Sequence, residues 1–283
     1  MERLRHYAEL VKFEHTIFAL PFALASVLIL AEEFPSFWRL FWIVVALVSA
    51  RTLGMAFNRL IDKPYDALNP RSRDWPLVSG KLSEEDVKKL ILLSGGIFVL
   101  STLMINFLAF LLSPVVILLL WLYPYSKRFT HFPHLVLGLV YFLIPVAVDV
   151  ALNASISVQA VLLGIAMASW VSGFDILYSL QDYEFDREHG LKSVPVRFGI
   201  EGALRISRGL HLTTLFALLV LGFISSKLGF VYFLGVISLS FFLAYEHSLI
   251  KPYDLSKVNK AFFTVNGYVS IVFFITVLID YLL

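Results

Sequence analysis

Five polar side chains recur at a helical spacing in two separate parts of the chain. The first group lies in the stretch N-R-L-I-D-K-P-Y-D, where Asn58, Asp62 and Asp66 are each four residues apart. In a helix this step places the three side chains on one face, one turn apart. The second group, D-Y-E-F-D, repeats the step at Asp182 and Asp186. Carboxylate and amide oxygens are the ligands of hard divalent cations, so both groups could bind Mg²⁺.

Basic side chains follow both groups. Arg71 comes five residues after Asp66, and Lys192 comes shortly after Asp186. A guanidinium binds phosphate oxygens through two hydrogen bonds, and divalent cations neutralise the remaining charge. The combination favours a diphosphate ligand. A single carboxylate pair at a helix end is more often a solvated surface pair, and a lone Arg there often contacts lipid headgroups. The repetition of the pattern favours the metal–diphosphate interpretation.

The composition predicts an all-α, polytopic membrane protein. The chain has 283 residues, of which 59% are hydrophobic and 16% charged, and its mean hydropathy is +0.81. Soluble domains are about half apolar and about one quarter charged. No small-residue cleavage site follows the first apolar run, so we expect this run to remain as a span. The absence of cysteine excludes disulfides, thiolate chemistry and Cys-ligated metal sites.

Apolar runs of membrane-spanning length predict nine helices in a single domain, 1–283, with two pseudo-repeat halves of about 1–130 and 131–283. The expected spans are 13–32, 37–61, 87–108, 110–124, 134–152, 157–181, 203–225, 229–247 and 261–282. The third and fourth runs almost touch, so seven spans with re-entrant segments are the alternative. With nine spans, 20 of the 23 Lys and Arg residues fall on one side. The positive-inside rule then places the N-terminus and both carboxylate groups toward the cytoplasm.

Other polar residues lie at or inside the expected spans. Arg51 lies two turns before Asn58, where an arginine normally faces a polar cavity or snorkels to the surface. Asp175, Tyr178 and Asp182 step by three and four residues and therefore share a helix face. The loop W-L-Y-P-Y-S-K-R contains Tyr123 and Lys127, which could be interface residues or could line the site.

These motifs together resemble the UbiA superfamily of intramembrane prenyltransferases. The first motif, with the N-P-R-S-R that follows it, is similar to the family's N/D-x-x-x-D-x-x-x-D. The stretch D-I-L-Y-S-L-Q-D-Y-E-F-D, with its Lys-Ser tail, is similar to the family's D-x-x-Y-x-x-x-D-x-x-x-D, and Y-P-Y-S-K-R also matches. The resemblance covers the whole chain, although the last three spans carry no diagnostic motif.

The resemblance implies nine helices around a central cavity with a cytoplasmic cap, and two Mg²⁺ ions that bridge a prenyl diphosphate. The residues that match the metal and diphosphate positions are Asn58, Asp62, Asp66, Asp182 and Asp186. Those that match diphosphate-binding positions are Arg71, Lys127 and Lys192, with Tyr123 nearby. Arg51 resembles a residue of the acceptor pocket, and Asp175 and Tyr178 match family positions at the catalytic site.

The expected reaction is transfer of a prenyl group to an aromatic acceptor. The opening K-F-E-H-T-I-F-A-L-P-F-A, with R-T-L-G-M-A-F-N-R, resembles the 4-hydroxybenzoate polyprenyltransferase-like branch, which serves quinone (ubiquinone or menaquinone) or related lipid biosynthesis. A naphthoate, a glyceryl phosphate lipid or a porphyrin remain alternative acceptors. The expected partners are the prenyl diphosphate, the aromatic acceptor and the bilayer, with no nucleic acid. The sequence does not indicate an oligomeric state.

Two other classes of protein fit the residues less well. A CDP-alcohol phosphotransferase also uses aspartates at the membrane surface, but its motif requires a D-G dipeptide, which is absent from the chain. A proton-coupled transporter would explain charged residues inside spans, such as Asp175 and Arg51. It would not explain two carboxylate groups that are each followed by a basic loop.

Overall fold

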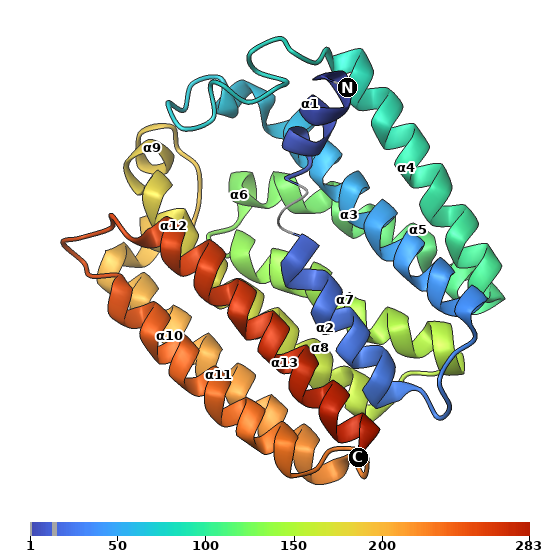
Figure 1. Cartoon of the computed structure of the whole chain (residues 1–283). Helices are drawn as coiled ribbons and strands as arrows, with labels where there is room; N and C mark the ends of the chain where they lie inside the picture. Colours follow the sequence, from blue (N-terminus) through green and yellow to red (C-terminus); the bar gives the residue numbers. More distant parts are fainter. Residues whose placement is uncertain (1, 13–15) are drawn as a thin grey trace. The chain divides into compact units, whose positions relative to one another are not determined.

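The computed structural model describes residues 2–12 and 16–283. In these residues the chain is helical apart from turns and one isolated bridge between Lys251 and Asp254, which confirms the expected all-α class (Figure 1). The chain forms two compact units. One consists of Met1–Thr16 and Ser36–Tyr125, and the other of Ile17–Pro35 and Ser126–Leu283. The organisation as a single domain of two pseudo-repeat halves stays a prediction.

The first unit contains three long helices, a short helix and a 3₁₀ turn. They are α1 (Glu2–Leu10), α3 (Phe37–Asp66), α4 (Glu84–Ile105), α5 (Phe107–Leu122) and η2 (Tyr123–Tyr125). Ser83 and Asp86 form a capping box that begins α4. Only Asn106 separates α4 from α5, and its side chain accepts a hydrogen bond from the Ala109 amide at 2.8 Å. The α4–α5 hairpin therefore consists of two capped helices, and each lies in a run that is long and apolar enough to cross a membrane.

The second unit contains the remaining helices. They are α2 (Thr16–Leu30), α6 (Ser126–Phe129), α7 (Pro133–Asn153), α8 (Val158–Ser179), η3 (Leu180–Asp182), α9 (Tyr183–Glu188), α10 (Val194–Ile224), α11 (Phe230–Leu249), α12 (Val258–Lys260), η4 (Ala261–Val265) and α13 (Asn266–Leu282). The run that contains α8 is the most enclosed, with 72% of its apolar window buried. Helix α8 packs against both α7 and α10, so it forms the centre of this unit.

Eight helices of the described residues are long and apolar enough to cross a membrane. They correspond to eight of the nine expected spans. The ninth, 13–32, corresponds to α2, an apolar helix of 15 residues, and residues 13–15 lie outside the described part. Fifteen helical residues rise about 22 Å, which is less than the hydrocarbon thickness of about 30 Å. The nine-span expectation is therefore met by eight described helices and by the described part of a ninth apolar run.

Helix α10 begins at Val194, earlier than the expected start at residue 203. The Ser193 hydroxyl accepts a hydrogen bond from the Val196 amide at 3.4 Å, and Pro195 fits the first turn of a helix. Gly199 interrupts the regular helix with a φ of 70°, a conformation that glycine adopts without steric cost. The charged residues near this start explain why a hydropathy-based prediction placed it too late.

Candidate active site

The first carboxylate motif occupies the C-terminal turns of α3. The Asn58 amide nitrogen donates a hydrogen bond to Asp62 Oδ2 at 3.0 Å, so these two side chains share a face, as their spacing predicted. Asp62 is only 4% exposed, and Asp66 is partly buried. The negative end of the helix dipole also lies here. Two carboxylates at the C-terminal end of a helix make this region favourable for a cation.

Arg59, which the sequence analysis did not select, connects this motif to its surroundings. Its Nε donates to the Leu10 carbonyl at 3.2 Å, and its Nη1 lies 3.8 Å from Asp66 Oδ2. Its guanidinium carbon lies 3.7 Å from the centre of the Trp75 ring, a typical cation–π distance. The signal in the sequence was its position two turns before Asp66, on nearly the same helical face.

The loop after α3 is built from successive turns, which suit its Pro, Asn and Gly residues. The Ser72 hydroxyl donates to the Asp66 carbonyl at 2.9 Å, and Asn69 Oδ1 accepts from the Arg71 amide at 2.9 Å. Arg71 itself is exposed, with its guanidinium carbon 5.8 Å from the Trp75 ring centre. The Lys12 ammonium lies 5.6 Å from the same ring. Trp75 therefore contacts three cations beside the first motif.

Arg51 binds the end of the N-terminal helix of this unit. Its two terminal nitrogens donate to the carbonyls of Val11 and Lys12, each at 2.9 Å. Carbonyls that follow a helix carry partial negative charge, so an arginine stabilises them. This contact fixes the guanidinium near the end of the described N-terminal segment, residues 2–12. The expected role of Arg51 in an acceptor pocket stays a prediction.

Tyr123 lies in the 3₁₀ turn η2, at the end of the first unit. This turn packs against α3 and α5, and Tyr123 is partly buried. Tyr125, in the same turn, packs on Trp121 with ring centres 5.2 Å apart. The structure thus places Tyr123 beside the helix that carries the first motif, and its expected contact with a diphosphate stays a prediction.

The second carboxylate motif does not continue α8 as a regular helix. Helix α8 ends at Ser179, a 3₁₀ turn follows, and Asp182 occupies the N-cap position of α9. Asp186 lies inside α9, which is only six residues long. A 3₁₀ turn is tighter than an α-turn, so the first and second motifs present their carboxylates on differently shaped backbones.

Basic residues of the second unit lie beside Asp186. Three side chains interact electrostatically or by hydrogen bonding with Asp186: Lys127, Asp182 and the Ser193 hydroxyl. The Lys192 amide donates to the Lys127 carbonyl at 2.8 Å, and the Lys192 ammonium lies 3.4 Å from the Phe129 carbonyl. The segment after Tyr125 therefore lies beside the second carboxylate motif, and the expected contact of Lys127 with a diphosphate stays a prediction.

Asp175 has a partner that the sequence did not reveal. His134 Nδ1 lies 2.7 Å from Asp175 Oδ2, and His134 is 4% exposed. The Ser172 hydroxyl donates to the His134 carbonyl at 2.9 Å, which fixes the start of α7 against α8. The ion pair or hydrogen bond explains how a carboxylate is accommodated inside an apolar span. Its only signal in the sequence was a histidine at the start of an apolar run.

The donor set fits a hard divalent cation. All five motif side chains carry oxygen atoms, and the Asn58 amide nitrogen donates to Asp62, so its oxygen is the atom that could bind a cation. Within the described residues, no three His, Asp or Glu side chains surround a common point. Mg²⁺ is usually held by one or two carboxylates together with water and substrate phosphates. Asp62 with Asp66, and Asp182 with Asp186, therefore suit an ion that binds together with a diphosphate.

The chain is similar to proteins of one family. The model of the UbiA prenyltransferase family matches residues 19–275. The 4-hydroxybenzoate octaprenyltransferase of Shewanella frigidimarina is 30% identical over 290 aligned positions, which cover 100% of this chain and 99% of that protein. The protein of the same name from Francisella tularensis subsp. tularensis is 31% identical over 92% of this chain and 89% of its own length.

Solved structures agree with this assignment. The apo structure of a UbiA homolog from Aeropyrum pernix K1 has 31% sequence identity and a TM-score of 0.84, and the match covers 94% of this chain and 98% of that one. A UbiA homolog from Archaeoglobus fulgidus bound to DMAPP and Mg²⁺ shares the fold, with a TM-score of 0.75 and 20% identity over 98% of this chain and 99% of that one. This chain is a multi-pass membrane protein and belongs to the UbiA prenyltransferase family.

Proposed function

We propose that this prenyltransferase moves a prenyl group from a prenyl diphosphate to an aromatic acceptor of the 4-hydroxybenzoate type, with Mg²⁺ as the metal. The observation that carries this proposal is the presence of two oxygen-donor motifs, each with basic side chains in its own unit. The acceptor is assigned from relatives named 4-hydroxybenzoate octaprenyltransferase, which match this chain over nearly their whole length.

Each motif residue has a proposed role. Asn58, Asp62, Asp66, Asp182 and Asp186 hold two Mg²⁺ ions, whose charge lowers the free energy of the leaving diphosphate when they are bound. Arg71, Lys127 and Lys192 bind the diphosphate oxygens, with Tyr123 beside them. Arg51 and Asp175 contact the acceptor side of the site, and Tyr178 lies against the prenyl group.

In the reaction, the C–O bond between the prenyl group and the diphosphate breaks, and a C–C bond to the aromatic ring forms. The ring loses one proton, so the products are the prenylated acceptor, diphosphate and one proton. Basic side chains stabilise charge on the diphosphate as this bond breaks, because they are fixed before the reaction begins. Breaking the C–O bond gives an allylic cation, which water would convert to an alcohol. The apolar helices exclude this water. The long apolar prenyl chain explains why the reaction takes place inside a membrane.

The distribution of basic residues supports a cytoplasmic position for both motifs. Arg71 and Lys81 lie in the loop after α3, and Arg187 and Lys192 lie in the segment that contains and follows α9. Positive residues of this kind are enriched in loops on the cytoplasmic side. A water-soluble diphosphate headgroup and Mg²⁺ would then reach the site from the cytoplasm.

The test uses the purified full chain in detergent with geranyl diphosphate, Mg²⁺ and 4-hydroxybenzoate. We expect mass spectrometry to detect geranylated 4-hydroxybenzoate. EDTA should abolish its formation, because without the metal the C–O bond between the geranyl group and the diphosphate does not break. Binding of geranyl diphosphate without product would contradict the acceptor and direct a screen of naphthoates and glyceryl phosphate. If Mg²⁺ does not promote binding of the diphosphate, the roles assigned to the two motifs are wrong.

A further inference from the structure

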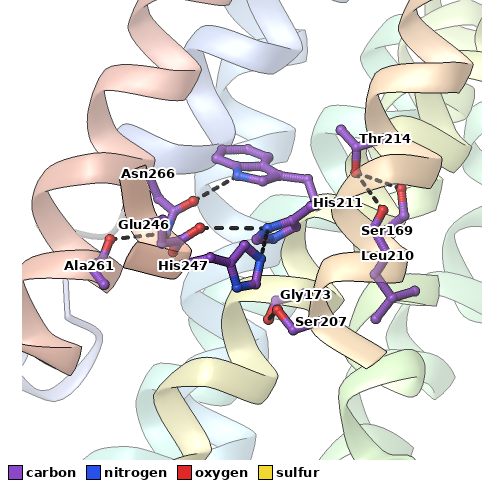
Figure 2. Close-up of polar contacts among 11 residues, drawn as sticks. Ser169, Gly173, Ser207, Leu210, His211, Thr214, Glu246, His247, Ala261 and Asn266 are labelled. Atoms are coloured by element: carbon purple, nitrogen blue, oxygen red, sulfur yellow. Dashed lines mark hydrogen bonds and ion pairs between the residues drawn. The ribbon is translucent and has the colours of Figure 1, made fainter. Parts of the chain in front are cut away.

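The last membrane helix contains one turn of π-helix, η4, between α12 and α13. A π-turn is wider than an α-turn, is rare, and occurs frequently at functional sites. Asn266 follows this turn, and its side-chain nitrogen donates to the Ala261 carbonyl at 3.2 Å (Figure 2). This hydrogen bond satisfies a carbonyl of the widened turn, so the side chain of Asn266 stabilises the irregular backbone.

Two other buried groups hold Asn266 in place. Its nitrogen also donates to Glu246 Oε1 at 2.6 Å, and its oxygen accepts from Trp170 Nε1 at 2.7 Å. Glu246 and Asn266 are both 0% exposed, and Trp170 is 1% exposed. Glu246 and Asn266, which Figure 2 shows, belong to α11 and α13, and Trp170 belongs to α8. Polar groups buried inside a span are costly, so a network of three implies a requirement for one defined geometry.

The π-turn carries two aromatic residues that contact a proposed site residue. The ring centre of Phe262 lies 4.1 Å from that of Tyr178 with an interplanar angle of 32°, and Phe263 meets the same ring at 6.3 Å and 86°. Tyr178 is partly exposed and precedes Asp182 by four residues. Phe174 lies 5.3 Å from Phe262 and 5.3 Å from Trp170. The network around Asn266 therefore fixes the rings that surround Tyr178.

We propose that the π-turn is a positioning device for Tyr178, and that Glu246, Asn266 and Phe262 act through it. The proposal rests on the proposed function, because it assigns the Tyr178 ring to the allylic end of the prenyl donor. The negative face of an aromatic ring attracts a cation that lies over it. The orientation of the ring therefore decides whether it can stabilise the cation. Tyr178 touches the substrate, whereas Phe262 and Asn266 are positioning residues that fix its ring.

The test compares the affinities of the full chain in detergent for geranyl diphosphate and for inorganic diphosphate, both with Mg²⁺, by calorimetry. Tyr178→Leu and Phe262→Leu should each weaken geranyl diphosphate binding about three- to tenfold, the range for a lost aromatic contact. Neither variant should change the affinity for inorganic diphosphate. Because Phe262 acts through Tyr178, the double variant should bind no more weakly than Tyr178→Leu alone.

Matched variants separate positioning from general stability. Phe273, in α13, is 1% exposed and stacks on Phe22 at 4.6 Å, so Phe273→Leu should lower thermal stability without changing the ratio of the two affinities. Asn266→Ala should weaken geranyl diphosphate binding as much as Phe262→Leu does. Glu246→Gln can still accept the hydrogen bond from Asn266, so its affinities should equal those of the unmodified chain. The proposal would be overturned if Phe262→Leu and Phe273→Leu changed the ratio of the two affinities equally. It would also be overturned if the double variant Phe262→Leu, Tyr178→Leu bound geranyl diphosphate more weakly than Tyr178→Leu alone. Because the comparison requires no acceptor, it stands even if 4-hydroxybenzoate is not prenylated.

Discussion

Asp62 occupies a position that is unfavourable for a carboxylate, and the proposed metal role would explain it. The side chain is almost fully buried, at the end of α3 where the helix dipole is negative. Burial and the dipole both raise the free energy of a carboxylate in the folded chain. The hydrogen bond from Asn58 offsets part of this cost. A cation bound beside Asp62 would offset the rest of this free-energy cost. Metal binding would therefore explain why a carboxylate occupies this buried position.

We therefore expect Asp62→Asn to abolish prenyl transfer while the chain still folds. Loss of a charged group that stabilises the leaving diphosphate should lower kcat by at least about 100-fold. The measurement is the rate of product formation with Mg²⁺ and geranyl diphosphate, together with thermal unfolding of the same preparation. Asp74→Asn is the matched control, because the Asp74 side chain is 90% exposed and its ion pair with Arg73 is weak. Equal activity of the two variants would contradict the metal assignment.

Local spacing predicted the motif residues, but long-range partners could not be predicted. The four-residue step between Asn58 and Asp62 produces the observed contact through the helix geometry alone. His134 pairs with Asp175 from 41 residues away, and Arg51 binds carbonyls about 40 residues before it. Such partners depend on how helices pack, which one sequence without an alignment does not specify.

At the scale of elements, apolar runs predicted most of the long helices. Their ends were less predictable, because polar residues such as Arg197 and Glu201 hide the first turns of α10 from a hydropathy measure. The π-turn at Ala261–Val265 could not be predicted, because its geometry depends on the buried contacts of Asn266 rather than on a local pattern. The irregular elements are therefore the ones that the sequence analysis missed.

The contact between α8 and α10 provides a test at this scale. A Cβ at Gly173 would overlap the ring of His211, and the Ser207 hydroxyl donates to the Gly173 carbonyl at 2.7 Å. Gly173→Ala should force the helices apart and lower the free energy of unfolding by about 1–3 kcal/mol. Thermal unfolding in detergent is the measurement.

The control for Gly173→Ala is a glycine in an open part of a helix. A Cβ at Gly96, in α4, meets nothing within 4 Å, so Gly96→Ala should be neutral or stabilise by up to about 1 kcal/mol, because alanine favours a helix more than glycine does. Equal destabilisation of both variants would mean that the close approach of α8 and α10 does not limit stability.

At the scale of the whole molecule, the two motifs belong to different compact units, and each unit supplies its own basic residues. The charge distribution also predicts on which side of the membrane each loop lies. Basic residues are concentrated in the N-terminal segment and in the loops that follow the motifs, so we expect these parts to share the cytoplasmic side.

Helix α2 is the element on which this topology depends. Its described residues number 15, and residues 13–15 before them lie outside the described part. If α2 crosses, the N-terminal segment and the loop after α3 lie on one side, and the loop around Glu33 lies on the other. If α2 does not cross, the N-terminal segment lies with Glu33 instead.

The chain contains no cysteine, so single cysteines can report on sidedness without a background signal. We expect Arg5→Cys and Lys81→Cys to be protected from a membrane-impermeant maleimide in spheroplasts, and Glu33→Cys to be labelled, because the basic segments remain in the cytoplasm. All three side chains are exposed, and permeabilised cells give the full signal for each. Labelling of Arg5→Cys together with Glu33→Cys would show that α2 stays on one side of the membrane. Labelling of Lys81→Cys with protection of Glu33→Cys would mean that the orientation is reversed, and it would place the first carboxylate motif outside the cell.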